Sequence, residues 1–137
     1  MRFVKISREE MGRSAKLYEG VMAQACQGLY FREGQIIGEE LSKLAARDGD
    51  DFFTVVGKLV VGRGWADEAK FDQRRATFKG SIEASAGVAE GCHRLRGIVK
   101  AIYEAKVNRN LTIVEEECEG QGGKNCVFAI EGFGDVL

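Results

Sequence analysis

Three cysteines and one glutamate in the second half of the chain are spaced as metal ligands, in the order Cys92, Glu115, Cys118 and Cys126. Cys118 and Cys126 bracket a glycine-containing loop between two alternating apolar runs, so a hairpin would bring both sulfurs to the same end of two paired strands. Cys92 precedes a helical pattern, and a thiol at a helix N-terminus is shifted towards the thiolate, the form that binds zinc. Three sulfurs and one oxygen complete a tetrahedral shell, which predicts a structural zinc site.

Residue types and spacing also allow other interpretations of this site. His93 could replace Glu115 as the fourth ligand, because imidazole is the commoner ligand in structural zinc sites. Glu115 and Cys118 would face opposite sides of a regular strand, so the strand must bulge or end between them. Two further alternatives remain: the thiols could form a disulfide, or they could be buried in the core without a metal. Cys26 lies in an apolar helical pattern and is expected in the core.

Length and composition are those of one soluble globular domain that spans residues 1–137. Hydrophobic residues make up 45% of the chain, charged residues 30%, and the net charge is −1, with no long run of like charge. This composition does not indicate direct nucleic-acid binding or a membrane-surface patch. The N-terminus lacks the apolar region of a signal peptide and no apolar stretch reaches membrane-spanning length, which predicts a cytoplasmic protein without a membrane span.

Apolar periodicity predicts an alternation of helices and hairpins. The residues from Ser7 to Glu10 form a capping box that opens the first helix. Gly34 separates it from a second helical stretch, which is expected to stop at Asp48-Gly49. Gly34 and Gly38 form a small-xxx-small pair that would allow another helix to approach. The expected elements are helices over 7–29 and 36–45, a helix over 52–60, strands over 65–71 and 76–85, a helix from 92 to about 108, and strands over 111–117 and 126–133. This order predicts an α+β domain with a four-stranded antiparallel sheet, made of two hairpins, and helices covering one face.

At Cys92 and from Glu115 to Ile130 the sequence resembles the 4-vinyl-reductase domain family, which is related to TRAPP transport-particle subunits and to the sensor domains of phenol-responsive transcription activators. That family likewise has an acidic residue, a cysteine, a glycine-containing loop, and a cysteine followed by an alternating aromatic and aliphatic strand. In the phenol sensors these positions resemble a zinc site of three thiolates and one glutamate, which favours Glu115 over His93. A looser similarity at residues 17–20, 38–41 and 62–65 extends the resemblance over nearly the whole chain.

The resemblance implies a ligand-binding domain of the NO-signalling and Golgi-transport type, with a pocket between helices and sheet and zinc at its margin. The implied ligand is an apolar or aromatic, hydrocarbon-like small molecule, and we expect Phe71, Phe78 and Tyr103 to contact it, with the Tyr103 hydroxyl as polar handle. The phenol sensors pair a histidine with a tryptophan on the phenol hydroxyl. Here His93 lies beside a predicted metal thiol, and Trp65 stands earlier in the chain than the tryptophan of the phenol sensors. An apolar or larger ring ligand therefore suits this chain as well as a phenol.

The resemblance also implies a homodimer through the N-terminal helices, over residues 7–46. Two other functions compete with that of a sensor domain. One is a component of tetrapyrrole vinyl-group reduction, but the chain has no G-x-G-x-x-G motif between a strand and a helix, and we predict no catalytic residue. The other is a non-catalytic adaptor that uses the fold only as an interaction surface.

Overall fold

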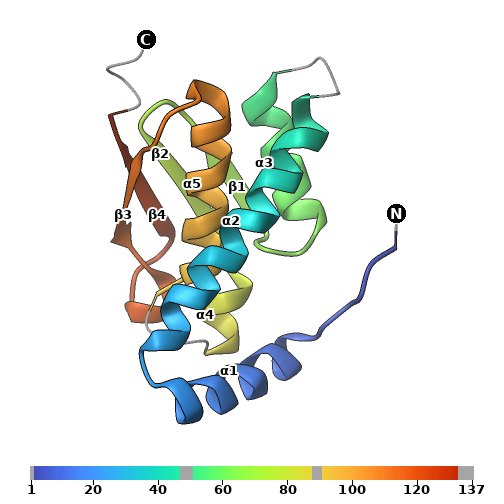
Figure 1. Ribbon diagram of the computed structural model, residues 1–137, viewed down its shortest axis with the longest axis vertical. Helices are drawn as coiled ribbons and strands as arrows, with labels where there is room; N and C mark the ends of the chain where they lie inside the picture. Colours follow the sequence, from blue (N-terminus) through green and yellow to red (C-terminus); the bar gives the residue numbers. More distant parts are fainter. Residues whose placement is uncertain (1, 47–50, 88–90, 133–137) are drawn as a thin grey trace.

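The computed structural model describes residues 2–46, 51–87 and 91–132, which form a helical layer on a four-stranded sheet (Figure 1). The sheet is antiparallel throughout, in the order β1-β2-β4-β3, so the two predicted hairpins join through their second strands. The elements are α1 (Arg8–Met22), α2 (Ala25–Ala46), α3 (Phe52–Gly62), β1 (Glu68–Phe71), β2 (Arg75–Lys79), α4 (Ile82–Ala86), α5 (His93–Val107), β3 (Thr112–Glu117), the short helix η1 (Glu119–Gln121) and β4 (Cys126–Glu131).

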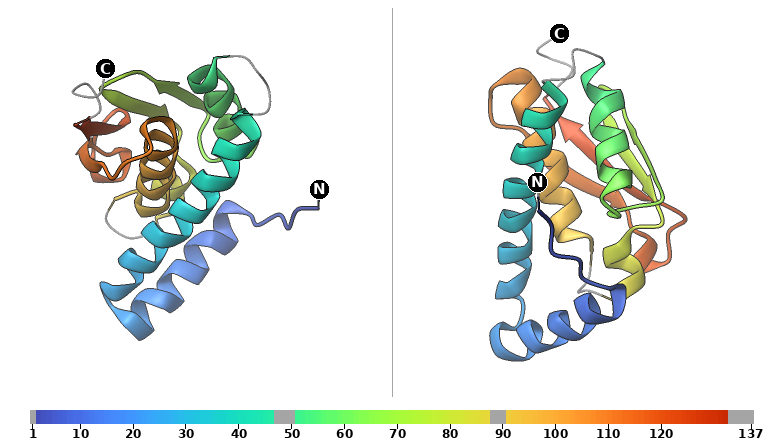
Figure 2. Two further views of the ribbon diagram at one scale, coloured as in Figure 1. Left: turned by 45° about the horizontal axis from the view of Figure 1, so that its top comes forward. Right: turned by 90° about the vertical axis from the view of Figure 1, so that its right-hand side faces the viewer.

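The main core lies between α5 and the sheet. The apolar face predicted for α5 is buried throughout, and alternate residues of β4 are buried beneath it, as period-two alternation requires. Figure 2 shows α2 and α5 on the same side of the sheet, with α5 nearer the strands. The predicted α+β class, with helices covering one face, is therefore confirmed. No helix among the described residues combines the length and the apolar character needed to span a membrane.

Close contact between α2 and α5 depends on glycine. A Cβ atom at Gly34 would lie 2.0 Å from the Arg94 carbonyl oxygen, and one at Gly97 would lie 2.1 Å from the Phe31 carbonyl oxygen. At Gly38 the corresponding distance to the Ile98 carbonyl oxygen is 2.6 Å. The helix expected to approach the small-xxx-small pair is therefore α5.

The break between the first two helices lies elsewhere than predicted. We expected it near Gly34, but α1 ends at Met22 and α2 runs without interruption through Gly34 to Ala46. The chain turns at Ala23, a non-glycine residue with φ of 50°. Gly34 serves close helix packing rather than helix termination, and only the position of α5 distinguishes the two roles. The stop expected at 48–49 lies outside the described residues.

The first hairpin is shorter than predicted. Its second strand was expected to continue to Ser85, but β2 ends at Lys79, because Gly80 turns the chain at φ of 70° and the Ser81 hydroxyl accepts a hydrogen bond from the Ala84 amide at the start of α4. The apolar alternation after Ser81 belongs to this short helix. The first strand begins at Glu68 rather than at Trp65.

The N-terminal segment carries most of the large apolar side chains that are exposed among the described residues. Helix α1 packs through Ala15 and Gly12 against α4 and the start of α2, and it projects from the body of the fold (Figures 1 and 2). Eight of the ten large apolar side chains that are exposed among the described residues lie within residues 3–36. They are Phe3, Val4, Ile6, Leu17, Tyr18, Val21, Leu29 and Ile36; the other two are Val61 and Val114.

Candidate metal centre and ligand groove

Three of the predicted metal ligands meet in one buried cluster. The sulfur atoms of Cys92, Cys118 and Cys126 all lie within 4.8 Å of one another, and the Sγ atoms of Cys92 and Cys126 are 3.5 Å apart. All four cysteines of the chain are free thiols, so the alternative of a disulfide among the clustered thiols is not realised. Cys26 lies in the separate small core beneath α1, as expected.

The second hairpin and the start of α5 bring the thiols together. Cys126 opens β4 opposite Phe78 of β2, Cys118 follows the last residue of β3, and Cys92 immediately precedes α5. The pairing of β3 with β4 slips between Glu115 and Glu117, which is a β-bulge. The spacing of Glu115 and Cys118 requires a bulge or a strand end between them, and the structure has both.

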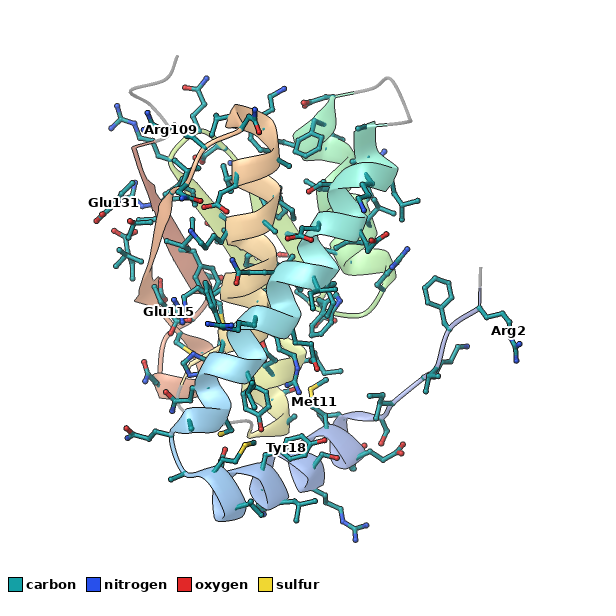
Figure 3. The ribbon with its side chains drawn as sticks, viewed as in Figure 1. Arg2, Met11, Tyr18, Arg109, Glu115 and Glu131 are labelled. Carbon is teal, nitrogen blue, oxygen red and sulfur yellow. The ribbon has the colours of Figure 1, made fainter. Side chains whose placement is uncertain are left out.

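The two candidates for the fourth ligand lie side by side at the margin of the thiol cluster. The Glu115 carboxylate, labelled in Figure 3, accepts a hydrogen bond from the Cys92 amide at 3.4 Å. A Cβ at Gly91 would lie 3.2 Å from a Glu115 carboxylate oxygen and 3.5 Å from the His93 ring. Burial raises the pKa of Glu115, while the Cys92 amide, the Arg96 charge and a hydrogen bond with Cys118 act in the opposite direction.

The environment of Cys92 differs from the one inferred from its place before a helix. We expected the free amides of the first helical turn to stabilise its thiolate, but the buried carboxylate of Glu83 accepts from the Arg94 and Leu95 amides, at 3.2 and 2.9 Å. Cys92 itself makes no side-chain capping hydrogen bond. A hydrogen bond shared with Cys126 and burial raise the pKa of Cys92, and the same hydrogen bond lowers the pKa of Cys126.

Sequence reasoning missed two polar side chains beside the thiols. Ser81 Oγ is 3.2 Å from Cys92 Sγ, and a carboxylate oxygen of Glu119 is 3.4 Å from Cys126 Sγ. Glu119 directly follows Cys118 in the chain, so its position next to a predicted metal ligand could have identified it from the sequence. Ser81 lies 11 residues before Cys92, and no spacing rule points to it.

The donor set fits a zinc ion. Sulfurs that bind zinc at about 2.3 Å in a tetrahedral shell lie roughly 3.8 Å apart, close to the Cys92–Cys126 separation of 3.5 Å. Thiolates are soft ligands that select zinc over magnesium or calcium. Because all three cysteines are buried, the cluster is suited to a closed structural site.

The three residues expected to contact a ligand also lie together. The Phe71 ring centroid is 5.5 Å from that of Phe78 and 6.0 Å from that of Tyr103. Phe53, which sequence reasoning placed only in a helical pattern, joins them at 5.1 Å from Tyr103. The Tyr103 hydroxyl donates to the Asp72 carbonyl at 2.5 Å, so the residue expected as a polar handle for a ligand holds the β1–β2 turn.

An open groove of about 610 Å³ lies between α3 and β1, within the usual size range of small-molecule sites. Phe53 and Phe71 line it, whereas Phe78 and Tyr103 are fully buried behind them. This groove opens to solvent and shares no lining residue with the thiol cluster, whereas we expected an internal pocket with zinc at its margin. Its charged residues balance, with two acidic and two basic side chains: Asp51, Glu68, Lys58 and Lys70.

Comparison with known proteins yields matches to solved structures. No protein-family model and no curated protein matches the sequence. The phenol-responsive sensory domain of the transcription activator PoxR, solved with phenol, has a TM-score of 0.81 and 18% identity over 95% of this chain and 76% of that chain. A vinyl-4-reductase family protein from Methanocaldococcus jannaschii has a TM-score of 0.57 and 14% identity over 96% of this chain and 98% of that chain. The chain therefore has the α+β fold of the PoxR sensory domain and of this vinyl-4-reductase family protein, which confirms at the level of fold the resemblance seen in the sequence.

Proposed function

We propose that this chain is a zinc-stabilised domain that binds an apolar or aromatic small molecule and acts as a sensor. The observation that carries the proposal is the cluster of three buried thiols in a chain whose fold matches a phenol-responsive sensory domain. A cytoplasmic location belongs to this proposal, because a zinc site made of three thiolates needs a compartment that keeps cysteines reduced.

Zinc would be held by Cys92, Cys118 and Cys126, with Glu115 as fourth ligand. Its role is structural: it ties the loop between β3 and β4 to the start of α5, two segments that the chain otherwise joins only through α5 and β3. A closed shell of four protein ligands leaves no position for a substrate, and it fixes the tetrahedral geometry instead.

The ligand would bind in the groove between α3 and β1 and contact Phe53 and Phe71, which lie in front of the buried Phe78 and Tyr103. Phe53 and Phe71 give the groove an apolar aromatic surface. The equal numbers of acidic and basic side chains that line it favour a neutral ligand over an ion. Burial of apolar surface would drive binding, at about 25 cal/mol per Å². The ligand class is therefore a neutral ring compound or hydrocarbon.

Thermal-shift screening against phenols, aliphatic hydrocarbons and tetrapyrroles tests the ligand proposal. A ligand at 100-fold its Kd stabilises the folded state by about 2.7 kcal/mol, so binding is expected to raise Tm by several degrees. Phe53→Ala should abolish this shift, because Phe53 lines the groove and contacts the ring of Tyr103.

Phe52→Ala is the matched control. Phe52 is the neighbouring half-buried phenylalanine of α3, but it does not line the groove, so its variant should keep the ligand-induced shift. A shift that survives in both variants would place the ligand elsewhere. Absence of a shift with every compound class would refute the sensor function.

We also propose a homodimer through residues 7–46. Five exposed large apolar side chains on α1 and α2 favour a second copy as the partner, since a monomer rarely leaves so many on one segment. They are Leu17, Tyr18, Val21, Leu29 and Ile36. Light scattering at micromolar concentration is expected to give the mass of a dimer. Val21→Glu should convert it to a monomer, whereas Val114→Glu, at an exposed apolar residue of β3, should not. A monomeric wild-type protein would contradict the proposal.

The same apolar surface favours a second candidate function, that of a protein–protein adaptor. In that case the N-terminal segment would bind a different protein and the groove would remain without a ligand. The screening experiment separates the two functions, because an adaptor gives no ligand-induced shift in Tm.

A further inference from the structure

The turn between β2 and α4 contacts the thiol cluster through Ser81. This serine is 1% exposed, and its Oγ lies 3.2 Å from Cys92 Sγ. The same oxygen accepts a hydrogen bond from the Ala84 amide at 3.4 Å. A hydroxyl carries one hydrogen, and acceptance from Ala84 leaves that hydrogen free. Since a metal-binding cysteine is a thiolate without a hydrogen of its own, Ser81 must be the donor in its contact with Cys92.

Glu119 connects the same turn to the loop that carries the other two thiols. One of its carboxylate oxygens accepts from the Gly80 amide at 3.0 Å, and the other accepts from the Ser81 amide at 3.0 Å. The latter oxygen is also 3.4 Å from Cys126 Sγ. Ser81 therefore donates through its amide to the thiol loop and through its hydroxyl to Cys92.

We propose that Ser81 is a positioning residue of the metal centre, which holds the Cys92 thiolate by an O–H···S hydrogen bond and slows the release of zinc. The inference rests on the proposed zinc site and adds a residue outside the ligand set. The hydroxyl withdraws electron density from the sulfur and fixes its direction. The amides of Gly80 and Ser81 hold Glu119, the residue after Cys118, against the same turn. Partners of this kind outside the ligand shell change metal affinity by about 10- to 100-fold when they are removed.

A purely structural role for Ser81 predicts a different result. Ser81 caps α4, and loss of the cap alone would loosen this short helix without changing the electronic state of the sulfur. The test therefore needs a signal that arises at the sulfur itself. In cobalt-substituted protein, the energy of the sulfur-to-cobalt charge-transfer band reports the electron density on the thiolates.

The experiment uses the full chain loaded with zinc. We expect Ser81→Ala to retain one zinc per chain but to transfer it to a chromogenic chelator about 10-fold faster than the wild type. The charge-transfer band of its cobalt form should move to lower energy, because a thiolate without the hydrogen bond is more easily oxidised. Ser85→Ala, on the exposed side of α4, is the matched control and should behave as the wild type in both measurements.

The outcomes separate this inference from the zinc site itself. Wild-type protein without stoichiometric zinc would overturn the metal centre and the inference with it. Zinc-loaded wild type with an unchanged release rate in Ser81→Ala, or faster release with an unmoved cobalt band, would overturn the role of Ser81 alone. If Ser81→Ala does not fold, Glu119→Gln provides the second test: faster zinc release supports the link through the turn, and a wild-type rate refutes it.

Discussion

Replacement of Cys126 with serine is expected to abolish stoichiometric zinc binding and to lower the free energy of unfolding by about 3 kcal/mol or more. Its sulfur is fully buried, 3.5 Å from that of Cys92. A serine hydroxyl binds zinc poorly, and the remaining thiols would be left as buried polar groups without the ion that holds them together. Because the metal binds only the folded chain, the lost binding energy is lost folding energy.

Elemental analysis and thermal unfolding with and without a chelator measure both effects. The chelator should lower the Tm of the wild type towards that of Cys126→Ser and leave the variant unchanged. Cys26→Ser is the matched control, since this buried thiol lies outside the cluster and its hydrogen bond to the Ala23 carbonyl can be made by a hydroxyl. Zinc retained in Cys126→Ser would show that the cluster is not the metal site.

The same measurements distinguish the two candidates for the fourth ligand. Glu115→Gln should weaken zinc binding less than the loss of a thiol does, because three sulfurs remain in place. His93→Ala should leave the zinc content unchanged. The reverse order, with His93→Ala the more damaging change, would assign the fourth position to His93.

Substitution of Gly97 by alanine is expected to destabilise the fold by about 3 kcal/mol, although alanine is the better helix former. A methyl group there would lie 2.1 Å from the Phe31 carbonyl oxygen and 2.8 Å from the Gln35 amide nitrogen of α2. Both obstacles are backbone atoms, so a rotamer change cannot relieve the overlap. The helices must separate, and the apolar core between α5 and the sheet loses its close packing.

Urea denaturation followed by circular dichroism measures the change, and Gly28→Ala is its control. Gly28 is an exposed residue of α2 with no atom within 4 Å of an added Cβ. The same substitution there should stabilise the protein, by up to about 1 kcal/mol. Equal effects at the two glycines would contradict the packing that the structure describes for α2 and α5.

Helix and strand identity followed from local patterns in most of the chain. The capping box at Ser7 is present with both of its hydrogen bonds, and the helix predicted from Cys92 ends at Asn108 in the left-handed conformation. Both patterns are local, since a cap or an apolar stripe depends on residues within one or two helical turns. The predictions failed where a local pattern had two meanings. Gly34 could end a helix or admit another helix, and the alternation after Ser81 could belong to a strand or to a short helix.

The sequence by itself determined the thiols that meet and the need for a bulge beside them, because ligand chemistry and strand periodicity are properties of residue type and spacing. Only the tertiary structure decided what surrounds those thiols. Glu83 reaches the first turn of α5 from another helix, and Ser81 reaches Cys92 from the turn after β2. Such contacts depend on how β2, α4 and α5 pack in space, and no spacing along the chain records that packing.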